Sequence, residues 1–113
     1  MSGSISFIEL VNKTLKNLKN STINKLEDWG KIVQLSIDDE DFFINFKEIK
    51  LKTLVKGYNE SYDFKLSTSY KIFDQIIHNE LNPVEAVVSG EVAIEGSLTD
   101  ALEFSEMMSK SQD

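Results

Sequence analysis

Apolar residues near the N-terminus of the chain recur at helical spacing. They are three or four positions apart: Phe7, Leu10, Val11, Leu15 and Leu18. This spacing predicts an amphipathic helix, and Ser6 and Glu9 stand at the spacing of a capping box at its start. The opposite side of the helix carries lysines, so it could lie on a membrane. Its apolar stripe is short, which favours packing against a sheet instead.

A second, shorter helix is predicted directly after the first. Ser21 or Thr22 would cap it, and Gly30 would end it. Its inward-facing positions would be Ile23, Leu26 and Trp29.

Strict alternation of apolar and polar residues follows and predicts four strands. Their inward-facing positions are Val33, Leu35 and Ile37, then Phe42, Ile44 and Phe46, then Leu51, Thr53 and Val55, and finally Tyr62, Phe64 and Leu66. Residues 38–41 are predicted to form the first turn, because four adjacent acids would pair poorly in a sheet. Residues 57–61 are predicted to form a loop, whereas the turn near residues 48–50 has no Gly, Asn or Pro to mark it.

Helical spacing returns in the last third of the chain. One helix is predicted from Ile72, Phe73, Ile76 and Ile77. Asn82 and Pro83 then suit the start of a short helix, with Glu85 at the position of a capping-box acid and Gly90 as its left-handed end. A fifth strand over residues 91–95 and a last helix capped by Ser97 follow. One face of that helix would hold Leu98, Ala101, Leu102 and Met108.

This order of elements predicts an α+β fold in a single domain, residues 1–113. The five strands would form a mainly antiparallel sheet, covered by helices on one face and open to water on the other. Alternation places polar side chains on the open face: Lys47, Lys65, Gln34 and Asn45. A chain of 113 residues is long enough for one hydrophobic core.

Charge and composition narrow the classes of partner. The net charge is −7, and all twelve cations are lysine. An acidic chain without arginine is a poor ligand for nucleic acid, whose phosphates need clustered cations. A transient contact with a membrane through a local lysine face stays open. No cysteine, basic leader or long apolar run is present, so we expect a cytoplasmic protein without disulfides.

No group of residues has the spacing of a catalytic site. His78 is the only histidine and lies one helical turn after Asp74, so an exposed or capping role is favoured over a general base. The acidic residues 38–41 lack the alternating ligands and central glycine of a calcium loop, which favours a solvated turn. No glycine-rich loop carries a phosphate-binding lysine. The sequence therefore predicts no enzyme, no metal site and no cofactor.

The C-terminal half carries a family resemblance. A polar strand end at residues 66–69 and an apolar helix precede Leu81-Asn82-Pro83, and Ala86-Val87-Val88-Ser89-Gly90 leads into a strand. These segments resemble the sterol carrier protein type 2 family. The resemblance extends over about residues 7–110 and is strongest in residues 66–102. It implies a small lipid-binding module with an apolar tunnel.

Three functions remain as hypotheses. The resemblance implies an intracellular, non-catalytic carrier that holds a long-chain acyl or isoprenoid ligand, with sterol as a weaker alternative. The second hypothesis is an accessory or protein-interaction module of a lipid or acyl-transfer pathway with no lipid cargo of its own. The third, an enzyme acting on an apolar substrate, is disfavoured by the missing catalytic groups.

Periodicity alone does not distinguish a filled core from a tunnel. If there is a tunnel, its wall is predicted to come from apolar residues of the covering helices. The candidates are Phe73, Ile76, Ile77, Val84, Val87, Val88, Leu98, Leu102, Met107 and Met108. Two adjacent methionines favour a tunnel slightly, because their flexible side chains adapt to varied apolar shapes.

Overall fold

The computed structural model describes residues 3–47 and 54–110. In chain order its elements are α1 (Gly3–Lys16), α2 (Asn20–Trp29), β1 (Ile32–Ile37), β2 (Glu40–Asn45), β3 (Val55–Lys56), β4 (Phe64–Thr68), α3 (Tyr70–Ile77), α4 (Pro83–Val88), β5 (Ala93–Gly96) and α5 (Leu98–Lys110). The strands form one sheet in the order β3-β2-β1-β4-β5. Strand β1 is parallel to β4, and the other three pairings are antiparallel. The predicted α+β fold with a mainly antiparallel sheet is confirmed.

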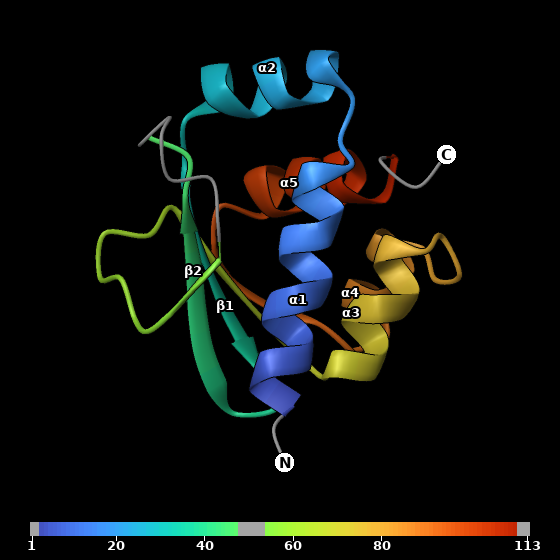
Figure 1. The fold of residues 1–113 in the computed structure, drawn as a ribbon. Helices are drawn as coiled ribbons and strands as arrows, with labels where there is room; N and C mark the ends of the chain where they lie inside the picture. Colours follow the sequence, from blue (N-terminus) through green and yellow to red (C-terminus); the bar gives the residue numbers. More distant parts are fainter. Residues whose placement is uncertain (1–2, 48–53, 111–113) are drawn as a thin grey trace.

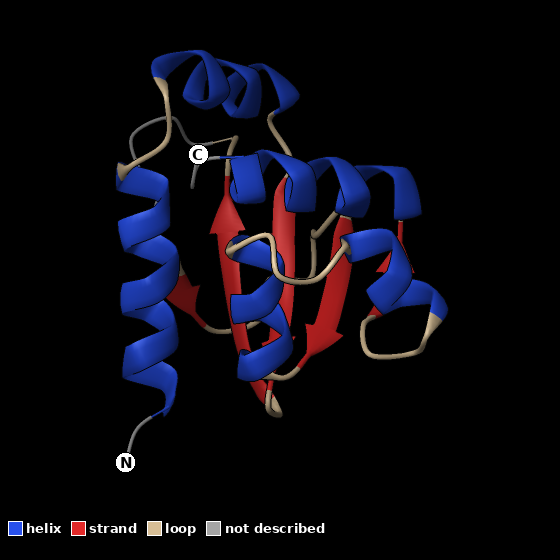
Figure 2. Ribbon diagram, turned by 90° about the vertical axis from the view of Figure 1, so that its right-hand side faces the viewer, coloured by secondary structure: helices blue, strands red, loops and turns tan. Residues whose placement is uncertain are grey.

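The helices lie against one face of the sheet (Figure 2). Strand alternation turns one apolar set toward them, and its described members are buried: Val33, Leu35, Ile37, Phe42, Ile44, Phe46, Phe64 and Leu66. Helix α1 contributes Phe7, Val11 and Leu15 to the same core. Helix α2 lies across one end of the sheet, above α1 and α5 (Figure 1). Among the residues described, no helix combines the length and the apolar character needed to cross a membrane.

Two predicted helix starts are wrong. Helix α1 begins at Gly3, so Ser6 and Glu9 lie inside it rather than at a capping box; no proline stands before Ser6 to stop the helix. Helix α2 begins at Asn20, with Lys19 at the N-cap and no side-chain cap. The Lys19 carbonyl accepts hydrogen bonds from the N–H groups of Thr22 and Ile23. The backbone therefore forms the first turn of the helix without a capping hydroxyl from Ser21 or Thr22.

The acidic turn is shorter than predicted. Only Asp38 and Asp39 form it, both with positive φ (50° and 68°), and Glu40 and Asp41 belong to β2. Two-residue hairpins favour such left-handed residues, and Asp tolerates them. The predicted mutual repulsion in the ladder does not arise, because Glu40 pairs with Ile37 and Asp41 pairs with Ser36 across the hairpin.

Gln34 is buried rather than exposed on the open face of the sheet. Its Nε2 donates to the carbonyl of Gly57 at 3.2 Å, and its Oε1 accepts from the N–H of Asn59 at 2.7 Å. The loop of residues 57–63 therefore lies over this face, on the side away from the helices (Figure 1). In the same loop, the hydrogen bond between the hydroxyls of Tyr62 and Tyr58, which favours the neutral form of Tyr62, and then desolvation raise the pKa of Tyr62.

The short helix α4 is capped as predicted. The Asn82 side chain accepts hydrogen bonds from the N–H groups of Val84 and Glu85, and Pro83 is the first helical residue. At the other end Gly90 has φ +84°. Its N–H donates to the Val87 carbonyl, and the next N–H, of Glu91, donates to the Ala86 carbonyl. This pair of bonds is a Schellman motif, which closes the C-terminal end of the helix as the Asn82 side chain closes its N-terminal end.

Helix α5 buries a slightly different face from the predicted one. Ser97 caps it, accepting a hydrogen bond from the N–H of Asp100 at 3.1 Å. Its buried positions are Ala101, Phe104, Ser105, Met108 and Ser109. Leu98 is half exposed, against the prediction, because it begins the helix directly after the edge strand β5.

Of the predicted third strand, only Val55 and Lys56 belong to β3, whereas Leu51, Thr53 and the predicted turn at 48–50 lie outside the described residues.

Candidate functional site

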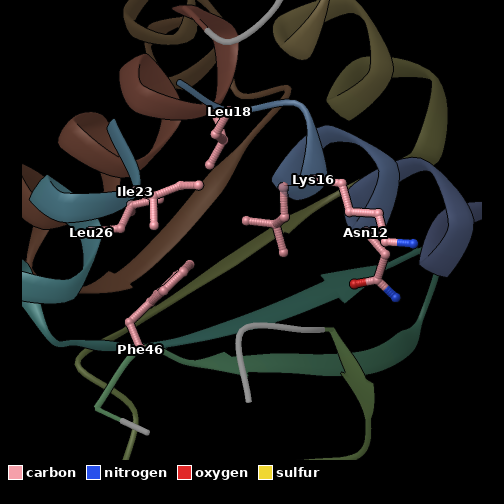
Figure 3. Close-up of a pocket in the computed structure, with 7 residues that line it drawn as sticks. Asn12, Lys16, Leu18, Ile23, Leu26 and Phe46 are labelled. Carbon is pink, nitrogen blue, oxygen red and sulfur yellow. The ribbon is translucent and has the colours of Figure 1, made fainter. Parts of the chain in front are cut away.

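An apolar pocket of about 300 Å³ lies between the end of α1, the inner side of α2 and the end of β2. Its lining residues are Asn12, Leu15, Lys16, Leu18, Ile23, Leu26 and Phe46. Figure 3 shows Leu18, Ile23 and Phe46 converging on the space, with Asn12 and Lys16 on one side of it. The volume is at the lower end of the range found for small-molecule sites.

Local sequence explains why the pocket opens here. Helix α1 ends at Lys16, and the backbone turns at Asn17, whose N–H donates to the carbonyls of Lys13 and Thr14. Leu15 and Leu18 therefore stand on either side of a change in chain direction. In α2 the inward residues Ile23 and Leu26 are three positions apart and face the same space. Two apolar stripes thus meet at one end of the sheet at an angle, which leaves a gap between them.

Polar groups lie only at one side of this pocket. Asn12 and Lys16 are one turn apart on α1. The Asn12 Oδ1 accepts from the N–H of Leu54 at 2.9 Å, which leaves the Asn12 amide Nδ2 to donate. Within the described residues Lys16 is exposed and forms no ion pair. An amide donor and an ammonium beside an apolar space suit an anionic head group on an apolar chain.

Phe46 connects the lining of the pocket to an aromatic cluster. Its ring centroid lies 5.9 Å from Trp29 and 6.3 Å from Phe104. Trp29 stacks on Phe104 at 6.2 Å and donates from Nε1 to Glu103 Oε1 at 3.2 Å. Phe64 completes the group, 6.0 Å from Phe104. Helix α5 is therefore tied to the pocket by aromatic packing.

The ten predicted wall residues fall into three groups. Buried in the core are Phe73, Ile76, Ile77 and Met108; partly buried are Val87, Leu102 and Met107; exposed are Val84, Val88 and Leu98. Met107 lines a more polar pocket of about 280 Å³ between α2 and α5, with Lys25, Trp29 and two glutamates. The structure thus spreads the ten over core, rim and surface, and a tunnel lined by them stays a prediction.

Helical periodicity assigns four lining residues of the apolar pocket to the core: Leu15, Leu18, Ile23 and Leu26. It does not single out Asn12, Lys16 or Phe46 for a site. The signal available in the sequence was the short break near residues 17–19 between two amphipathic stripes, with a polar pair one turn before it. Periodicity gives the inward face of each helix but not the angle at which two helices meet.

His78 and the acidic turn, the two candidates for catalysis or metal binding, both contact neighbouring residues of the fold. His78 Nδ1 lies 3.1 Å from Asp74 Oδ1 and 2.9 Å from the Asp74 carbonyl, at the exposed end of α3. Asp38 Oδ2 accepts from the N–H of Tyr70 at 3.1 Å and so helps to begin α3. Within residues 3–47 and 54–110, no three acidic or histidine side chains gather in a group that could hold a metal ion.

Comparisons with known proteins agree on one fold. The model of the SCP-2 sterol transfer family matches residues 11–109. The chain resembles sterol carrier protein domain 2 of Helicoverpa armigera with a TM-score of 0.72 at 19% identity, covering 95% of this chain and 86% of that one. It resembles UbiJ-SCP2, a ubiquinone synthesis protein, with a TM-score of 0.71 at 12% identity, over 99% and 96% of the two chains.

A palmitated SCP2L2 of Aedes aegypti is also similar, with a TM-score of 0.60 at 17% identity, over 87% of this chain and 93% of that one. At these identities the solved structures show a shared fold. No curated protein sequence matches significantly.

Proposed function

The chain belongs to the SCP-2 sterol transfer family, and from this premise we propose that it is an intracellular, non-catalytic carrier of a long-chain acyl or isoprenoid ligand. The observation that carries the proposal is the apolar pocket under α1 and α2, with a lysine and an amide on one side of it. The palmitated relative from Aedes aegypti supports an acyl ligand. A sterol is less well suited, because its rigid ring system cannot bend to follow a space of about 300 Å³ as a flexible chain can.

The pocket gives the ligand a direction. Leu18, Ile23 and Phe46 would surround the apolar chain, and a carboxylate would lie toward Lys16 Nζ and Asn12 Nδ2. Each methylene removed from water contributes about 0.8 kcal/mol, so affinity should rise roughly fourfold for every added carbon until the space is full. A ligand with a neutral head group would keep the free energy gained by burying its chain and would lose the charge-assisted hydrogen bonds.

Longer chains would have to open the inner end of the pocket. At that end Phe46 packs against Phe104 of α5, and the flexible side chains Met107 and Met108 of the same helix can change shape more easily than the aromatic rings. We propose that the chain extends from the α1–α2 pocket toward these methionines and Leu102. Phe73 and Ile77 lie deep in the core, so they would join the wall only after α3 and α5 separate.

The test is a binding series with the purified, delipidated protein. Saturated fatty acids of 8 to 18 carbons compete with a fluorescent acyl probe, and each acid is matched by the alcohol of the same length. The proposal expects affinity to rise with length and the acid to bind more tightly than its alcohol. It is wrong if no acyl probe saturates and native mass spectrometry of freshly purified protein shows no bound lipid.

One observation favours the second hypothesis, an accessory module without lipid cargo. The ubiquinone synthesis protein UbiJ-SCP2 has the same fold over nearly the whole of both chains. That hypothesis leads if acyl binding fails while the protein co-purifies with an enzyme of lipid or acyl-transfer metabolism. Neither reading assigns a catalytic residue.

A further inference from the structure

Helix α4 turns two valines toward water. Val84 and Val88 are one turn apart, hence on the same side of the helix, and 52% and 82% exposed. The opposite side holds α4 in place: Ala86 is fully buried and Val87 is packed against the core. Figure 2 shows α4 at the edge of the helical layer, beside the edge strand β5. The outer face of α4, meaning Val84 and Val88 with the residues around them, is thus apolar and uncovered by any described residue.

The chain's own hydrogen bonds hold this face in place. The Asn82 cap and the two bonds of the Schellman motif satisfy the ends of a helix too short to be stable alone. Valine has a poor helix propensity, and Val88, at 82% exposed, removes little apolar surface from water, so its side chain contributes little to folding. A pair of exposed valines on one fixed face is better accounted for by docking than by stability.

The charge around the face has one sign. Residues 72–109 contain eight acidic residues and no lysine or arginine. Around α4 the exposed acids are Glu80, Glu85 and Glu91. Within the described residues none of these three forms an ion pair, whereas Glu95 pairs with Lys65 at 3.9 Å on the other face of the sheet. Phosphate-rich partners, both anionic membranes and nucleic acids, would be repelled, and so would the same face of a second copy.

We propose that the outer face of α4 docks a basic amphipathic helix of a partner protein. An apolar side chain of the partner packs between Val84 and Val88, and lysine or arginine side chains on either side of it meet Glu85 and Glu91. The apolar pair gives the contact its position, and the acidic rim speeds encounter and rejects acidic partners. Two valines make a small interface, so the complex is transient, with a Kd in the micromolar range.

The experiment uses the whole chain and a fluorescein-labelled 14-residue peptide of leucine and lysine with helical amphipathic spacing. Fluorescence anisotropy at two salt concentrations gives Kd for the wild type and for the double variant Val84→Ser/Val88→Ser. The matched control is Val55→Ser, because Val55 is 45% exposed on β3 and far from α4 in sequence. A peptide with serine in place of leucine keeps the charge and removes the apolar face.

We expect the double variant to weaken binding of the leucine-lysine peptide about tenfold or more, with Val55→Ser at wild-type affinity and the serine peptide binding poorly to all three. Amide chemical shifts in the wild-type complex should move in residues 82–91. Equal affinity of the double variant overturns the proposal, as do shifts confined to the acidic turn at Asp38 and Asp39. Self-association that the double variant abolishes would replace the partner with a second copy, and sedimentation with anionic vesicles through α4 would replace it with a membrane.

Discussion

The α1–α2 pocket and the outer face of α4 are built from the same kinds of side chain in opposite arrangements. In the pocket, Leu18, Ile23 and Phe46 surround a hollow, and the charged group beside it is Lys16. On α4, Val84 and Val88 stand out from a convex surface whose neighbours are glutamates. A hollow with a cation suits a small anionic amphiphile that it can enclose. A bulge with anions suits a larger cationic surface that wraps around it. Shape and charge sign, rather than hydrophobicity, separate the two expected ligands.

The largest expected effect is on the free energy of unfolding of the domain, on which both regions depend. Gly96 ends β5 with φ +92°, and a Cβ there would lie 2.6 Å from the Asp63 carbonyl oxygen, an atom of the backbone. Gly96→Ala should therefore reduce the free energy of unfolding by about 3 kcal/mol or more, through both steric overlap and backbone strain. Thermal unfolding followed by circular dichroism measures it. A loss below about 1 kcal/mol would mean that β5 shifts without disturbing the core, so that the α4 edge is independent of the pocket.

The next effect separates the two sites. Ile23→Glu places a carboxylate in the apolar pocket, where it is poorly solvated and repels the head group of a fatty acid. We expect fatty-acid affinity to fall roughly 50-fold while the leucine-lysine peptide binds as to the wild type. Displacement of the acyl probe and peptide anisotropy are read on the same preparations, with Val55→Glu as the control for an added surface charge. An unchanged acyl Kd would move the ligand away from this pocket, toward the wall predicted from the sequence.

A smaller effect should weaken peptide binding at α4 and leave acyl binding in the pocket unchanged. Gly90 has φ +84°, but a Cβ at this position would have no atom within 4 Å, so only backbone strain opposes a side chain there. Gly90→Val should destabilise the domain by about 1–2 kcal/mol and loosen α4, which weakens peptide binding severalfold and leaves acyl binding intact. Gly90→Ala should lower the melting temperature less, because an unbranched side chain tolerates a positive φ better than valine does. If valine is no worse than alanine, Gly90 does not hold the helix end in the left-handed conformation.

The smallest effect concerns the charge at the pocket. Lys16→Gln removes the ammonium and keeps an amide donor of similar length. An exposed ion pair contributes up to about 1 kcal/mol, so the affinity for a fatty acid should fall three- to fivefold and that for the matching alcohol should not change. Isothermal titration calorimetry with both ligands gives the ratio, and Lys13→Gln on the same helix serves as the control. An equal loss for acid and alcohol would show that Lys16 acts through packing of its methylene stem rather than through charge.

Sequence reasoning succeeded where one local rule decides the outcome. Alternation identified the buried residues of β1, β2 and β4, and Asn82, Pro83 and Gly90 marked both ends of α4, because capping and φ preferences act within a few residues. It failed at Gln34, whose burial depends on a loop more than twenty residues away. It also placed Leu98 inward, since helical periodicity does not show where the sheet beneath a helix ends.

By itself the sequence determined the family, the order of the elements, the sign of the charge and the set of apolar side chains available for a core. Each of these is a property of residue identity and of spacings shorter than a helix. Only the tertiary structure decided which apolar residues enclose a space and which face water. Leu18 and Val88 are both aliphatic residues near a helix end, yet one lines a pocket and the other is the most exposed of the large apolar side chains described. The angle between α1 and α2, and the position of α4 beside an edge strand, produce that difference.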